Sequence, residues 1–208
     1  SSFVYINGSS GGFNQSHYYQ YKNDTYTAMS IDSASRRFMF NPKISKLLAR
    51  VGTYPYYSWD QNNVNMDDIQ VDYWGCTINA VQFYVFDSTT LAPWENYNVS
   101  GSGRFGSNPV CNEPRRFFDF AFGQQSYRKK AMDFFDSIPN GMYVLVRNLL
   151  FNSNTSFINS WKADTATFGS GKSLWHKFHE NGLTLIDSFK TNIPFLFLFK
   201  KGDTTNFI

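Results

Sequence analysis

The chain has 208 residues, of which 17% are charged and 19% are aromatic, and its formal net charge is +3 at pH 7. Disordered chains are poor in aromatic residues, so this composition indicates a folded protein that can bury a substantial core. A nucleic-acid-binding protein usually gathers its basic residues on one face, whereas here they are dispersed apart from pairs such as Arg115-Arg116. We therefore expect no nucleic-acid partner, and the lack of a long apolar run argues against a membrane span.

The N-terminal half of the chain has the pattern of an all-β region. Residues 1–16 are rich in Gly, Ser and Asn, which predicts a flexible lead-in. Residues 44–51 are ambiguous between helix and strand, and the Gly, Pro and aromatic residues that follow favour a strand. A polar loop is expected at residues 59–68. Further strands are expected at residues 3–6, 25–31, 36–40, 69–74 and 78–86.

The C-terminal half alternates between strands and helices. Ser126 is expected to cap a helix that ends near residue 137, and the continuous apolar run at 142–150 is typical of a strand buried on both faces. A helix at 172–180 is expected to end at Asn181-Gly182, a common stop signal. The other expected elements are a long loop at 88–115, strands at 117–122, 183–186 and 195–199, and a short helix at 157–161.

These elements predict an α+β fold, a β-rich, sandwich-like sheet with two or three short helices in the C-terminal half. We expect three parts along the chain. The lead-in at 1–16 precedes a β-rich part at 17–77, and the α/β part at 78–208 is expected to pack with 17–77 as one unit.

Motifs for catalysis and metal binding are incomplete. Residues 166–173 are similar to a phosphate-binding loop, but Ala166 replaces its first Gly, so a turn that leads into a helix is favoured. His176 and His179 share one helix face, yet a third ligand and a catalytic Glu are missing from their motif. No Gly-x-Ser-x-Gly nucleophile motif occurs. We therefore expect no enzyme activity, no metal and no cofactor.

The two cysteines, Cys76 and Cys111, leave two alternatives open. In an oxidising compartment they could form a disulfide that stabilises the fold by roughly 3–4 kcal/mol. They could equally remain as two buried thiols.

A cluster of aromatic residues between 54 and 74 is the strongest candidate binding surface. Flat rings beside Asn, Asp and Gln suit sugar recognition, because a ring face covers apolar C–H groups while amides bind hydroxyls. The alternative is that these rings belong to the core of the β-rich part. The residues predicted to face a glycan are Tyr56, Tyr57, Trp59 and Trp74.

Several segments of the C-terminal part resemble those of one known family. Residues 78–86 resemble its apolar strand, residues 117–122 its Phe-Asp-aromatic strand, and Pro139-Asn-Gly-Met-Tyr-Val-Leu-Val146 its Gly-x-x-Val-Leu strand. With the closing Lys200-Lys-Gly202, the segment from 78 to 202 resembles the interleukin-like EMT inducer (PANDER-like) domain. That family is non-enzymatic, and a related domain binds sugar in the stem of an O-mannose N-acetylglucosaminyltransferase. The resemblance therefore implies a glycan as ligand.

The residues Gly12-Phe-Asn-Gln-Ser-His-Tyr-Tyr-Gln20 and the stretch 157–199 also resemble large bacterial surface proteins, the gingipain-type, sortase-like components of type IX secretion systems. This resemblance implies a non-catalytic domain beside a cysteine peptidase. We thus expect an extracellular or bacterial cell-surface binding module of a larger protein. Its expected partners are a glycan or a cell-surface protein, together with the neighbouring domains of the parent chain. The alternative is a structural or accessory domain of such a peptidase, without a ligand of its own.

Overall fold

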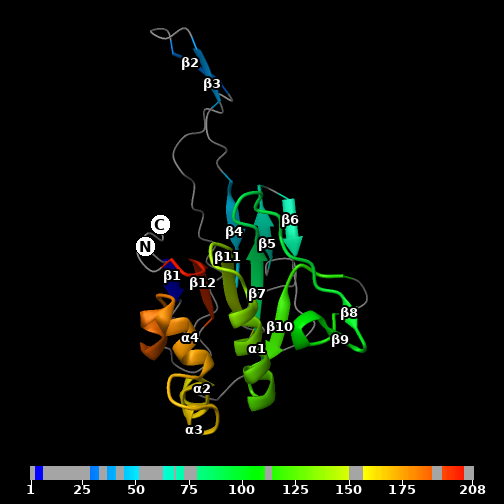
Figure 1. The fold of residues 1–208 in the computed structure, drawn as a ribbon, viewed down its shortest axis with the longest axis vertical. Coiled ribbons are helices and arrows are strands. Elements are labelled where there is room, and N and C mark those ends of the chain that lie inside the picture. Colours follow the sequence, from blue (N-terminus) through cyan, green and yellow to red (C-terminus); the bar gives the residue numbers. More distant parts are fainter. Residues whose placement is uncertain are drawn as a thin grey trace.

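The fold is given by a computed structural model (Figure 1). It describes residues 3–6, 29–32, 37–40, 45–51, 63–67, 69–72, 79–110, 114–149, 157–188 and 194–203. Its centre is a five-stranded antiparallel sheet in the order β1-β12-β11-β7-β10. The bounds of these strands are Phe3–Ile6 for β1, Phe195–Lys200 for β12, Tyr143–Leu149 for β11, Ala80–Phe86 for β7 and Phe118–Ala121 for β10.

The middle of this sheet is buried on both faces. All seven residues of β7 are buried, as are Val144 to Asn148 of β11, which confirms the prediction of a doubly buried strand at 142–150. Successive side chains of a strand point to opposite faces. Accordingly, Phe83 packs in one hydrophobic cluster and Tyr84 in another.

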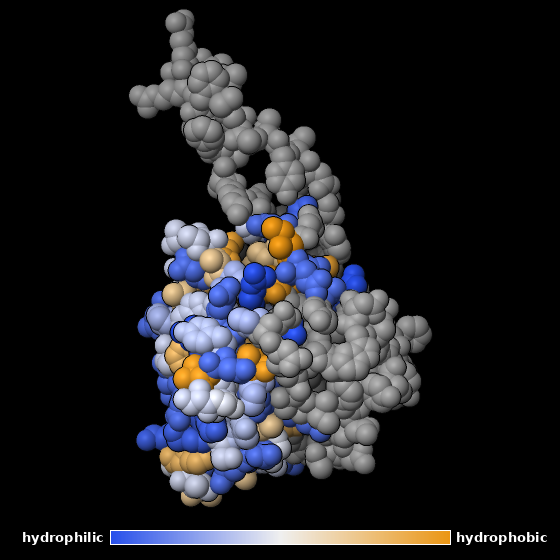
Figure 2. Space-filling model, turned by 90° about the vertical axis from the view of Figure 1, so that its right-hand side faces the viewer, coloured by the Kyte–Doolittle hydropathy of each residue, from blue (hydrophilic) through white to orange (hydrophobic). Residues whose placement is uncertain are grey.

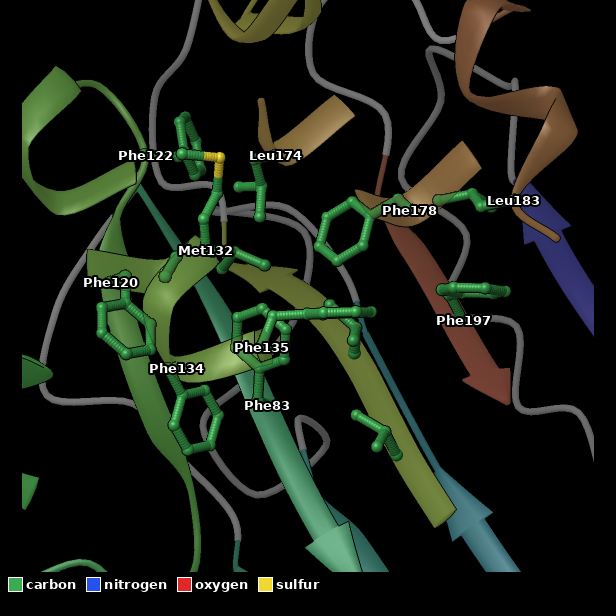
Figure 3. Close-up of a cluster of buried hydrophobic side chains, with 14 of the residues drawn as sticks. Phe83, Phe120, Phe122, Met132, Phe134, Phe135, Leu174, Phe178, Leu183 and Phe197 are labelled. Carbon is green, nitrogen blue, oxygen red and sulfur yellow. The ribbon is translucent and has the colours of Figure 1, made fainter. Parts of the chain in front are cut away.

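Helices cover the first face of the sheet. The longest is α1 (Gln125–Ser137), and it packs with α4 (Leu174–Glu180) over the strands. Figure 3 shows Phe134 and Phe135 of α1, together with Phe178 of α4, facing the sheet residue Phe83. The shorter helices α2 (Phe157–Ala163) and α3 (Thr165–Phe168) complete this layer.

A small antiparallel sheet lies over the second face. It comprises β4 (Leu47–Ala49), β5 (Val64–Met66) and β6 (Ile69–Asp72). Val64 and Val71 join Tyr84 and Phe117 in the hydrophobic cluster on this side. The expected α+β fold is therefore confirmed. A further hairpin of β2 (Met29–Asp32) and β3 (Arg37–Phe40) extends away from these layers (Figure 1).

Each face also holds a buried arginine. On the helical side, the Nε and Nη2 atoms of Arg128 donate to Asp164 at 2.6 and 2.8 Å, and Nη1 donates to the Phe122 carbonyl. On the other side, Arg147 donates to the Gln82 side chain and to the Tyr84 hydroxyl. Burying a guanidinium requires such partners, because desolvation of an uncompensated charge is very unfavourable.

Some predicted elements differ from the structure. Ser126 does not cap α1, because the helix begins at Gln125 with Gln124 as its N-cap and without a side-chain cap. The expected strand at 183–186 is wrong, since Thr184–Ser188 forms the 3-10 helix η3. The polar loop expected at 59–68 contains β5, and α3 was not predicted.

Other predictions agree with the structure or remain open. The strand at 44–51 is confirmed as β4, and the helix stop at Asn181-Gly182 is confirmed, with Gly182 at a φ of 101°. The strand expected within the lead-in is β1, which pairs with β12. The division at residues 16 and 77 stays a prediction. None of the helices in the described part of the chain has the length and apolarity needed to cross a bilayer.

Candidate functional site

The residues predicted to bind a glycan, Tyr56, Tyr57, Trp59 and Trp74, lie outside the described residues, as do Cys76 and Cys111. The glycan site between residues 54 and 74 and the disulfide therefore stay predictions.

The predicted turn before α4 is confirmed. Ser173 is the N-cap of α4, and its Oγ accepts the backbone N–H of His176 at 3.3 Å. The same Oγ lies 2.9 Å from Nδ1 of His176, which is the separation of a Ser–His pair. Ser173 is fully buried, however, so its hydroxyl serves as a helix cap that a substrate cannot reach.

The two histidines of α4 also contact an aromatic side chain. The ring of His179 stacks on Trp175 with centroids 4.8 Å apart, and Lys162 lies over the same indole. The indole N–H donates to Asp187 at 3.1 Å. Within the described ranges, no group of three potential metal ligands occurs.

A different part of the surface gathers exposed aromatic residues. The hairpin of β8 (Asn98–Val99) and β9 (Ser102–Gly103) leads into the 3-10 helix η2 (Arg104–Gly106). Of the five exposed large hydrophobic residues in the described part of the chain, three lie on this stretch, Tyr97, Val99 and Phe105. Figure 2 views the molecule from the side on which β8 and β9 lie in Figure 1, and it shows small hydrophobic patches among hydrophilic residues.

An arginine contacts two of these rings. The guanidinium carbon of Arg104 is 5.0 Å from the ring centroid of Tyr97 and 4.9 Å from that of Phe105. Its Nη1 donates to the backbone carbonyl of Glu95 at 2.8 Å. We name Trp94, Tyr97, Arg104 and Phe105 the hairpin cluster.

Phe105 anchors the hairpin cluster to the core. Its ring lies 5.3 Å from Phe134 of α1, 5.7 Å from Phe118 of β10 and 5.9 Å from the stacked ring of Trp94, measured between centroids. Its backbone has a φ of 58°, a left-handed conformation that is unfavourable for a bulky residue. The packing of the ring on the core compensates for this strain, and the residue as a whole remains 40% exposed.

Asn96 connects the strands of this region. Its Nδ2 donates to Ser107 Oγ at 3.1 Å and to the Phe117 carbonyl at 3.0 Å, while its Oδ1 accepts the Arg104 backbone N–H at 2.7 Å. The residue is fully buried, so these bonds are shielded from water. Asn96 thereby positions Arg104 relative to the sheet.

The position next to the hydrogen bonds of Asn96 is occupied by Gly103 and has no room for a side chain. A Cβ at that position would lie 2.2 Å from Ser107 Oγ and 2.5 Å from the Asn108 carbonyl oxygen. Only a residue without a side chain fits between the hairpin and the following loop.

A second cation lies near η2. A Cβ at Gly106 would be 3.4 Å from Cδ of Lys130, so the lysine stem runs along this helix. The Nζ of Lys130 is 4.6 Å from the ring centroid of Tyr127. The region thus combines exposed rings with two positive charges.

Comparisons of the chain with protein-family models, with curated proteins and with solved structures found no match. The resemblance to the interleukin-like domain therefore stays a prediction. Sequence reasoning placed the hairpin cluster in an undifferentiated loop at 88–115. The usable signal was Trp94, Tyr97 and Phe105 interleaved with Asn, Ser and Gly, the same chemistry that singled out residues 54–74.

Proposed function

We propose that this chain is a non-catalytic, extracellular or cell-surface module of a larger protein, and that it binds carbohydrate at the hairpin cluster. The observation that carries the proposal is that Tyr97 and Phe105, residues that are 46% and 40% exposed, both hold their rings within 5.0 Å of the Arg104 guanidinium carbon. Sugar C–H groups pack on aromatic faces, and guanidinium N–H groups donate to sugar oxygens.

Contacts with the core and with Asn96 hold the hairpin cluster in place, which favours ligand binding. Phe105 is packed against Phe118 and Phe134, and Asn96 holds the Arg104 backbone. A binding surface that is already ordered loses little conformational entropy when the ligand arrives. Exposed polar residues on the same hairpin, Asn98 and Ser100, add groups that bind hydroxyls.

A glycan array with the whole chain and three variants tests this function. Tyr97→Ala removes one ring of the hairpin cluster, and Ile69→Ala is the matched control because Ile69 is 70% exposed on β6. Binding that is lost in Tyr97→Ala and kept in Ile69→Ala supports the proposal. Trp59→Ala tests the set predicted between residues 54 and 74.

The results separate the alternatives. Binding that depends on Trp59 and not on Tyr97 moves the site to the sequence-predicted set. An array without any bound glycan overturns the proposal and favours the structural or accessory domain of a surface peptidase.

A further inference from the structure

We infer that the glycan bound at the hairpin cluster is acidic, and that Arg104 binds its carboxylate or sulfate group. This inference rests on the proposed function and adds the chemical class of the ligand.

Arg104 has donors that the fold does not use. A guanidinium carries five N–H hydrogens. Nη1 of Arg104 donates to the Glu95 carbonyl, and among the described residues no acceptor bonds Nε or Nη2 and no carboxylate forms an ion pair with Arg104.

Arg128 provides the contrast within the same chain. Its Nε and Nη2 both bond the carboxylate of Asp164, and its Nη1 bonds a backbone carbonyl. Arg128 is 5% exposed and its charge is compensated inside the protein, whereas Arg104 is half-buried and its charge is not. Arg104 is therefore equipped to bind an external anion.

The surroundings hold the guanidinium in place for such a ligand. Contacts with the rings of Tyr97 and Phe105 and the bond to Glu95 restrict the side chain, so less entropy is lost when an anion binds. A planar fork of N–H groups matches a carboxylate or sulfate through two parallel hydrogen bonds. The exposed parts of Tyr97 and Phe105 beside it offer apolar surface to the sugar that carries the acidic group.

The charges near η2 also favour an anion. Lys130 runs along Gly106, and no ion pair of Lys130 occurs within the described part of the chain. Between residues 94 and 110, Glu95 is the acidic residue, and its side chain is exposed. Glu95→Gln should therefore strengthen the binding of an acidic sugar and leave a neutral sugar unaffected.

Four forms of one polysaccharide test the inference by calorimetry. Chondroitin sulfate oligosaccharides carry both acidic groups, the desulfated form keeps the carboxylate, the carboxyl-reduced form keeps the sulfate, and the form treated both ways is neutral. We expect at least one acidic form to bind about 10- to 100-fold more tightly than the neutral form. The forms that keep one group identify which anion Arg104 binds.

Matched variants distinguish a site from diffuse attraction. Arg104→Gln should reduce the affinity for the acidic form to that for the neutral form, and Arg104→Lys should recover only part of it because the fork is lost. Lys129→Gln is the control for net charge, since Lys129 is exposed and paired with Asp133. An equal loss in Lys129→Gln and Arg104→Gln would indicate diffuse attraction and overturn the inference.

The failure of the inference is distinct from the failure of the proposed function. The array or the calorimetry could show binding of neutral glycans that depends on Tyr97 but not on Arg104. This result would support carbohydrate binding at the hairpin cluster and would overturn the inference that the ligand is acidic. Absence of binding to every neutral and acidic glycan overturns both. Thermal unfolding of Arg104→Gln within about 2 °C of the unchanged chain establishes that the variant is folded.

Discussion

The chain uses aromatic side chains in two opposite ways. In the core, Phe83 lies 5.4–6.5 Å, between ring centroids, from Phe120, Phe134, Phe135 and Phe178, and all five residues are essentially inaccessible. In the hairpin cluster, rings of the same kind lie on the surface around a cation. A residue type that stabilises the fold in one region is thus available for binding in the other.

The two regions differ in what keeps their rings in place. The core rings come from doubly buried strands and from α1 and α4, so the hydrophobic effect and close packing order them. The hairpin cluster is ordered by polar bonds of Asn96 and by the rings of Phe105 and Trp94, which both reach the core. We therefore expect core substitutions to act on stability and hairpin substitutions to act mainly on binding.

The largest effect is expected for Phe83→Ala. The substitution leaves a cavity among the four surrounding rings, and we expect a loss of about 3–5 kcal/mol in the free energy of unfolding. Tyr97→Ala should change it by no more than about 0.5 kcal/mol, because the ring is on the surface. Chemical denaturation of both variants measures the difference, and equal effects would refute the comparison.

The second largest effect is expected for the buried ion pair between Arg128 and Asp164 in the helical layer. Asp164→Asn leaves the Arg128 charge uncompensated, and we expect a loss of about 3 kcal/mol in the free energy of unfolding. The matched control is Asp133→Asn, which breaks the exposed pair with Lys129 and should have an effect of about 0.5 kcal/mol or less. A similar loss in the two variants would indicate that burial of the Arg128 pair is energetically unimportant.

Asn96→Ala is expected to loosen the hairpin cluster while sparing the core. Loss of the buried amide should destabilise the fold by about 1–3 kcal/mol, since Arg104 N–H and Phe117 carbonyl lose a partner. Amide hydrogen exchange should accelerate at Arg104. It should change little at Lys201, whose N–H donates to the Met142 carbonyl beside the central sheet, away from the hairpin. Unchanged exchange at Arg104 would contradict the positioning role of Asn96.

The strained backbone at Phe105 predicts different stabilities for two further variants. Phe105→Ala and Phe105→Gly both remove the ring, but only glycine adopts a φ of 58° without strain. We expect Phe105→Gly to be more stable than Phe105→Ala by about 1 kcal/mol. Thermal unfolding monitored by circular dichroism decides this, and the reverse order would show that the strain is relieved elsewhere.

The smallest expected effect is on the pH dependence of stability, and it concerns Asp87, which lies in the turn between β7 and the hairpin region. Hydrogen bonds from the backbone N–H groups of Thr90 and Thr89 hold the pKa of Asp87 below its ordinary value of 3.8. Because the pKa is lower in the folded state, the carboxylate contributes stability above pH 3.8, which is lost as the pH falls through the lowered pKa. A carbon-detected NMR titration should yield a pKa below 3.8 for Asp87, and a higher value would contradict these bonds.

The local sequence pattern predicted helices and strands correctly where residues close together in the chain determine the structure. The apolar runs predicted β7, β11 and β12, and Asn181-Gly182 predicted the end of α4, because these signals depend on residues close in the chain. The local sequence pattern gave the wrong element, a strand, at residues 183–186. Leu183 and Ile186 are both fully buried on one side of the chain, a spacing of three that a helical turn satisfies and a strand does not.

The sequence by itself thus determined the α+β class and the apolar strands, since periodicity is a local property. Tertiary structure alone decided that β1 pairs with β12, that Ser173 is buried as a cap, and that Tyr97 and Phe105 lie at the surface. The physical reason is that burial of a ring depends on what packs against it. At the hairpin, that packing comes from β10 and α1, which follow later in the chain.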